Sequence, residues 1–258
     1  MNPNSPNDSE GFWSNIADEW ARHEESSEAL YKRMAYREQR QIEGTVWEKE
    51  WDREFQAIAQ IASKVSSHLK HAEPEDLLWI KDGWTCDEPK RRSFTMWIWR
   101  HGVELPDDLV IPMLQQALRI DFREGQWAFV EPVVSVRGRH FVIEWLAPFL
   151  EDDNIDYSTR SVWAIVTALS EYIVGETSSL EELSWKVKEK FLRRFLSQPP
   201  TALARNLIHL IPLVAENCPL ALRSLVTRAN QIASRHPDRF LRDMYKIKLA
   251  EQMKAKNS

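Results

Sequence analysis

The stretch FVIEWLAPFL, from Phe141 to Leu150, has an apolar pattern that recurs twice, in LVIPMLQQAL (Leu109–Leu118) and in VKEKFLRRFL (Val187–Leu196). Aligned without gaps, the three copies share an apolar position held by Leu114, Leu146 and Leu192. The apolar residues of each copy follow the i, i+3, i+4, i+7 spacing of one helical face. A helix with a single apolar face buries it only against neighbouring elements, so the recurrence predicts stacked helices in a repeat architecture.

A second apolar-periodic stretch follows each copy after a short polar turn. Arg160–Tyr172 (RSVWAIVTALSEY) aligns with Arg205–Asn217 (RNLIHLIPLVAEN), so the repeating unit is a helix, a turn and a helix. The shared leucine recurs after 32 residues and then after 46, which indicates degenerate repeats. We predict three antiparallel helix pairs: Pro106–Leu118 with Gly125–Val136, Phe141–Leu150 with Ser158–Tyr172, and Trp185–Leu196 with Thr201–Glu216.

The run FVIEWLAPFLEDDNIDYSTRSVWAIVTALSEYI resembles a HEAT repeat, with Pro148 inside the first helix, Asp153 just after it and Arg160 opening the second. Two departures are Thr159, where the family favours an apolar β-branched residue, and Pro199, which replaces the acid of the third unit. The resemblance spans roughly residues 105–235 and implies a right-handed α-solenoid of degenerate HEAT-like hairpins. It also implies a structural Asp and Arg ladder between units, made of Asp121, Arg123, Asp153, Arg160 and Arg205.

The chain before the repeats has a different character. Residues 1–11 are rich in Asn, Pro, Ser and acid, and we expect them to be disordered. Residues 12–104 form an N-terminal helical region, with helices predicted at Phe12–His23, Ser27–Ile42 and Thr45–Ala72 and an irregular helical hairpin after residue 77. The HEAT-like region, residues 105–258, is compatible with one continuous array that includes 12–104. With 7 glycines and no sustained period-2 alternation, the fold class is all-α.

Composition also predicts the cellular compartment. The two cysteines have no metal-ligand spacing, and the stretch MNPNSPNDSEG has neither the basic nor the apolar part of a signal peptide. No run approaches the ~18 apolar residues of a membrane span. We therefore expect a cytoplasmic protein that does not enter a membrane.

Charge is divided unevenly along the chain. Residues 186–258 contain 15 Lys and Arg against 5 Asp and Glu, whereas residues 1–185 contain 19 against 34. The division predicts a basic surface for an acidic protein partner, or self-association between halves of opposite charge. The alternative is a solvated surface without a partner. The acidic majority disfavours nucleic acid, although a basic groove at one end of the array is compatible with it.

Two groups of side chains are candidates for binding. Lys186, Lys190, Arg193 and Arg194 flank the apolar stripe of their predicted helix and should face solvent. Among four irregularly spaced tryptophans, exposed indoles beside cations would suit a protein hot spot or base stacking. The residues of this second group are Trp97, Trp99, Arg91 and Arg92.

No catalytic constellation is recognisable, and we predict no catalytic residue, metal or cofactor. The chain lacks GxxxxGK[ST], GxGxxG, HExxH and GxSxG motifs. His68 and His71, at i and i+3, could hold a metal, but exposed histidines at a helix end are far commoner. His209 is expected in the core.

Three classes of function follow. The first is a non-enzymatic scaffold or adaptor that binds a protein on the surface of the helical array. The second is an inhibitor or immunity-type protein that blocks a toxin or enzyme. The third is a nucleic-acid-binding protein resembling the HEAT-like DNA glycosylases.

Overall fold

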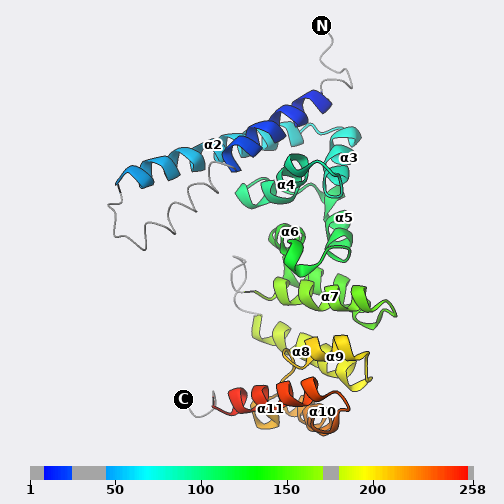
Figure 1. Cartoon of the computed structure of the whole chain (residues 1–258). Coiled ribbons are helices and arrows are strands. Elements are labelled where there is room, and N and C mark those ends of the chain that lie inside the picture. Colours follow the sequence, from blue (N-terminus) through cyan, green and yellow to red (C-terminus); the bar gives the residue numbers. More distant parts are fainter. Residues whose placement is uncertain (1–8, 25–44, 171–179, 255–258) are drawn as a thin grey trace. The chain divides into compact units, whose positions relative to one another are not determined.

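The computed structural model describes residues 9–24, 45–170 and 180–254, with the backbone alone for 45–51. All regular elements in these ranges are helices, which confirms the all-α prediction. The chain forms two compact units, Met1–Met113 and Leu114–Ser258, so the division falls inside a helix and not before the first repeat. Figure 1 colours the elements along the chain.

The first unit is built on two long helices. A helix over residues 9–24 lies along α2 (Thr45–Leu69), joined to it by ion pairs between Glu19 and Lys64 (2.8 Å) and between His23 and Glu54 (2.7 Å). Residues 9–11 thus belong to a helix and not to the disordered N-terminus expected from composition. The predicted helix Ser27–Ile42 lies outside the described residues.

A buried carboxylate joins these helices to α3 (Pro74–Gly83). The Asp76 side chain, 3 % exposed, accepts hydrogen bonds from Trp13 Nε1 (2.7 Å), His68 Nε2 (3.0 Å), the Glu73 N–H (2.8 Å) and the Ser9 hydroxyl. Burial by itself raises the pKa of Asp76, but the hydrogen bonds to its charged form outweigh burial and lower it. One carboxylate therefore fixes the register of three helices.

The tryptophan-rich stretch forms α4 (Pro89–Trp97) and the 3₁₀ helix η1 (Ile98–His101), and α4 packs on α3. The buried Thr95 carbonyl accepts both indole N–H groups of Trp84 (3.2 Å) and Trp99 (2.9 Å). Gly83 lies so close that an added Cβ would be 2.7 Å from Thr95 Cγ2. These tryptophans thus serve the core of the unit, where their N–H groups find partners.

The second unit contains the last two copies of the apolar pattern, and the first copy, Leu109–Leu118, crosses its boundary at Leu114. Its elements after α5 (Asp107–Ala117) and η2 (Phe122–Glu124) are α6 (Trp127–Leu146), η3 (Ala147–Glu151), α7 (Ile155–Ala168), α8 (Leu180–Leu196), α9 (Thr201–Leu207), η4 (Ala215–Asn217), η5 (Leu220–Leu222), α10 (Arg223–Arg235) and α11 (Arg239–Lys254). α7 packs on α6 and α9, α8 on α9 and α10, and α10 on α11. The shared leucine position is fully buried in all three copies, as its spacing predicts.

Buried polar side chains tie successive helices of this unit. Gln126, fully buried, donates through Nε2 to the carbonyls of Ala117 (2.7 Å) and Arg160 (2.9 Å). The Ser161 hydroxyl donates to the Leu146 carbonyl (2.8 Å). The Ala117 and Leu146 carbonyls lie at the ends of α5 and α6, where a carbonyl group lacks its usual partner within the helix.

Several predicted helices are wrong in extent. α8 begins at Leu180 and not at Trp185, and α7 spans Ile155–Ala168 and not Ser158–Tyr172. The backbone is not helical at Gly138 (φ 78°, ψ 161°), which separates the predicted helix Gly125–Val136 from the next one. The next helix, predicted as Phe141–Leu150, ends at Leu146, so Pro148 lies in η3 and not inside it.

In place of the predicted Thr201–Glu216, α9 ends at Leu207. A helix through Pro212 is disfavoured, because proline lacks an N–H and disfavours helix in the residue before it. His209 is consequently exposed and not in the core.

Replacing Leu146 or Leu192 by alanine should lower the free energy of unfolding by about 2–5 kcal/mol, because each leaves a cavity under a fully buried side chain. Leu220→Ala is the matched control, since Leu220 is 79 % exposed. Urea denaturation followed by circular dichroism measures the difference. Equal stability of the three variants would contradict the assignment of the stripe to the core.

Asp76→Asn should destabilise the first unit and reduce its sensitivity to acid. The lowered pKa of Asp76 means that its stabilisation is complete above the unfolded value of about 3.9 and is lost as pH falls through the folded value. In Asp76→Asn, an NH₂ group replaces the oxygen that accepts the Glu73 N–H. Two hydrogen-bond donors then face each other, and this hydrogen bond is lost. Tryptophan fluorescence during urea denaturation at pH 6 and pH 3 tests this, with exposed Asp82→Asn on the same helix as control. If Asp76→Asn loses as much stability between pH 6 and pH 3 as the wild type does, the prediction is refuted.

Candidate functional site

An open pocket of about 480 Å³ lies in the second unit, bounded by the end of α8, by α9, by α10 and by the turn into α11. We call it the α8–α10 pocket. Its size falls within the range of ligand sites, roughly 300–1,000 Å³. The floor is apolar: Phe195, Pro199, Ala204 and Ile232. The polar lining residues are Gln198, Gln231, Arg235 and His236.

The apolar floor of the pocket is formed where α8, α9 and α10 pack on one another. Phe195 closes the apolar stripe of α8 and is 2 % exposed, and Ala204 of α9 is equally buried. Both line the pocket because α8 packs on α9 and α10. The pocket therefore has a well-supported apolar base beneath exposed polar groups.

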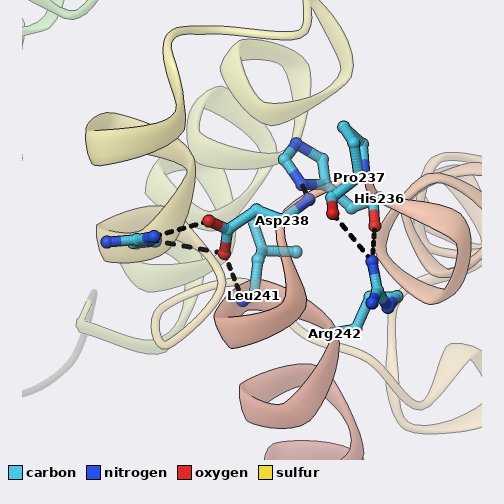
Figure 2. A network of polar contacts seen from close by, with 6 residues as sticks. His236, Pro237, Asp238, Leu241 and Arg242 are labelled. Atoms are coloured by element: carbon cyan, nitrogen blue, oxygen red, sulfur yellow. Dashed lines mark hydrogen bonds and ion pairs between the residues drawn. The ribbon is translucent and has the colours of Figure 1, made fainter.

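A polar network holds the turn between α10 and α11 (Figure 2). Asp238 caps α11 by accepting the Leu241 N–H (2.7 Å), and Arg205 of α9 donates to both of its carboxylate oxygens (2.5 and 3.4 Å). The hydrogen bond from Arg205, followed by that from Leu241, lowers the pKa of Asp238. Arg242 donates to the carbonyls of His236 (2.5 Å) and Pro237 (2.9 Å). The turn is thereby fixed beside the pocket.

The network also sets the hydrogen-bonding state of His236. Its Nδ1 accepts the backbone N–H of Asp238 (3.1 Å), so the proton of the neutral ring lies on Nε2. The neighbouring Arg235 side chain is exposed and makes no ion pair or hydrogen bond with another residue that the structure describes. Arg235 and His236 are thus hydrogen-bond donors at the pocket.

Gln198 has an unusual backbone conformation. It follows the end of α8 with φ 54°, and it is the one non-glycine residue of positive φ in the described ranges. Its N–H donates to the Phe195 carbonyl (3.1 Å), which ends the helix at the pocket wall. A left-handed conformation at a non-glycine residue costs free energy and is found preferentially at functional sites.

The basic residues predicted on α8 do not form a uniformly unpaired surface. Lys186 pairs with Glu182 (2.8 Å) and Arg193 with Glu189 (2.6 Å), each one turn earlier. The i, i+4 spacing of these pairs is visible in the sequence and could have identified them. Arg194 donates to the Ser197 hydroxyl (3.2 Å), while Lys190 is exposed without a partner among described residues.

The second predicted group lies in the first unit and is largely occupied by packing. Trp99 is 5 % exposed and therefore is not available to a partner, and Trp97 is half-buried. Arg91 lies over the Trp79 ring (4.2 Å) and donates to its carbonyl (2.5 Å). Arg92 is exposed. The structure does not bring these side chains together as an exposed aromatic and cationic patch.

Among the described residues, the five predicted ladder residues form no ion pair with one another. Arg160 donates to the Leu118 carbonyl (3.3 Å), and Arg205 pairs with Asp238. Asp121 caps η2 by accepting the Arg123 N–H (2.9 Å), whereas Asp153 is exposed. The arginines still join successive elements, but through different acceptors.

The two histidines considered as metal ligands, His68 and His71, have different surroundings. His68 binds Asp76 and stacks on Phe12 (ring centroids 4.0 Å apart), whereas His71 is exposed. Within the described ranges, no group of three or more His, Cys, Asp or Glu residues is placed to hold a metal ion. In the same ranges, no helix has both the length and the apolar character needed to cross a bilayer.

Arg205 was predicted from the sequence as a ladder residue, but its pairing with Asp238 was not. Gln198, Arg235 and His236 were not predicted as site residues. The segment His236-Pro237-Asp238 carries a helix-start signal, an Asp cap after a Pro, but no local pattern shows that it faces Phe195. Comparisons with protein-family models, with curated proteins and with solved structures found no match to this chain.

Gln198→Gly should raise the free energy of unfolding by about 0.5–1 kcal/mol, because glycine adopts positive φ without the steric penalty of a Cβ. Gln198→Ala keeps the Cβ and is the control. Thermal and urea denaturation of the two variants and the wild type provide the measurement. A glycine variant no more stable than the alanine variant would show that the backbone here is unstrained.

Proposed function

We propose that this chain is a protein-binding scaffold or adaptor without catalytic activity of its own, and that its second unit is a short right-handed array of degenerate HEAT-like hairpins. The succession of contacts supports the array: α6 with α7, α7 with α9, and α8 with α9 and α10. Such arrays typically offer their extended surface to a partner.

The observation that carries the proposal is the set of exposed, unpaired cations in the second unit. Lys190 on α8 and Arg228 and Arg235 on α10 have no ion pair with a described residue. They belong to the part of the chain with 15 basic against 5 acidic residues. Charges without internal partners remain available to an acidic protein.

The double variant Lys190→Glu with Arg228→Glu should capture the partner several-fold less efficiently than wild type, because exposed charges act on the encounter of two proteins. Raising salt should weaken capture by the wild type, since screening acts within ~8 Å at physiological ionic strength. The measurement is affinity purification from native lysate, with and without nuclease. Arg22→Glu with Arg53→Glu, two exposed arginines of the first unit, is the charge-matched control.

Each outcome separates the function classes. A stoichiometric protein that survives nuclease and is lost with the second-unit variant supports the proposal. If that protein is an enzyme or toxin whose activity falls in the complex, the chain is an inhibitor. Loss of all captured material after nuclease contradicts protein binding and favours a nucleic-acid partner.

A further inference from the structure

We propose that the α8–α10 pocket binds a short acidic segment of a protein partner, with one large apolar side chain on the pocket floor and an adjacent carboxylate at Arg235 and His236. This inference rests on the proposed protein-binding function. It identifies the class of segment that the second unit recognises.

The apolar part of the segment follows from the floor. Phe195, Pro199 and Ala204 are buried and come from three successive positions along the fold, the end of α8, the following turn and α9. Ile232 of α10 adds a half-buried side chain opposite this base. Water over such a floor is displaced favourably by an apolar side chain. A volume of about 480 Å³ also leaves room for the neighbouring residues of a peptide.

The acidic part follows from the donors. The Arg235 guanidinium is exposed, and the turn network leaves the Nε2–H of neutral His236 as its second donor. The nearest carboxylate along the chain, Asp238, is already bound by Arg205 and by the Leu241 N–H. Arg235 is therefore not neutralised by the turn that adjoins it. A guanidinium pairs with a carboxylate through charge-assisted hydrogen bonds.

A nucleic acid fits this pocket less well. Phe195 is the one Phe, Tyr or Trp residue that lines the pocket, whereas proteins that bind single strands stack successive bases on several aromatic rings. The other floor residues are aliphatic. The combination of an aliphatic base with two donors favours a residue pair such as phenylalanine or leucine beside glutamate.

Labelled peptides test the inference on the full chain by fluorescence anisotropy. The probe is acetyl-Gly-Glu-Phe-Glu-Gly-amide, and its controls are the peptide with both glutamates replaced by glutamine and the peptide with phenylalanine replaced by alanine. The probe should bind at least several-fold more tightly than either control. Arg235→Gln should weaken probe binding about tenfold, as expected for loss of a hydrogen bond between charged groups.

Arg22→Gln is the charge-matched control, because it removes the same charge from an exposed position of the first unit that does not line the pocket. It should leave probe binding within about twofold of wild type. No binding of the probe at millimolar concentration, equal binding of the three peptides, or equal effects of the two arginine variants would overturn the inference. Preferential binding of an oligothymidine in an Arg235-dependent manner would also overturn it.

The capture experiment distinguishes failure of this inference from failure of the proposed function. If Arg235→Gln captures the protein partner as well as wild type does and the probe does not bind, the pocket is not the docking point and protein binding stands. If neither the wild type nor any variant captures a protein, the proposed function itself fails.

Discussion

Burial of a single apolar face on each helix is the constraint on which the packing of the second unit depends. Leu146 and Leu192 are fully buried because α7 covers one and α9 and α10 cover the other. Phe195 is the last buried residue of the α8 stripe and is also the base of the α8–α10 pocket. The same packing that stabilises the second unit thus provides the apolar base of the pocket.

The first unit depends more heavily on buried polar groups. Asp76 joins three helices because its charged form has four donors, and the Thr95 carbonyl holds two indoles at once. Satisfied polar groups of this kind specify one arrangement of helices, since any shift would leave a buried group without a partner. The indole N–H groups of Trp13, Trp84 and Trp99 are therefore used in hydrogen bonds inside the unit.

Net charge and available charge differ in this protein. Lys186 and Arg193 add to the basic count of the C-terminal part, but each is paired one helical turn away. Asp238 subtracts from that count, yet it is bound to Arg205 and caps α11. The charges that remain available are exposed cations, such as Arg235, that form no ion pair with another described residue.

The sequence by itself determined the helical class, the shared buried leucines and a break between Val136 and Phe141, because the periodicity of apolar residues is a local property. Pro212 argues locally against the predicted helix Thr201–Glu216, since proline cannot continue a helix, but it does not specify that α9 ends at Leu207. Only the tertiary structure decided that Arg205 meets Asp238 and that Phe195 and Arg235 line one pocket. Those partners are distant in sequence, and their meeting depends on how α8, α9 and α10 pack, which no periodicity within one helix specifies.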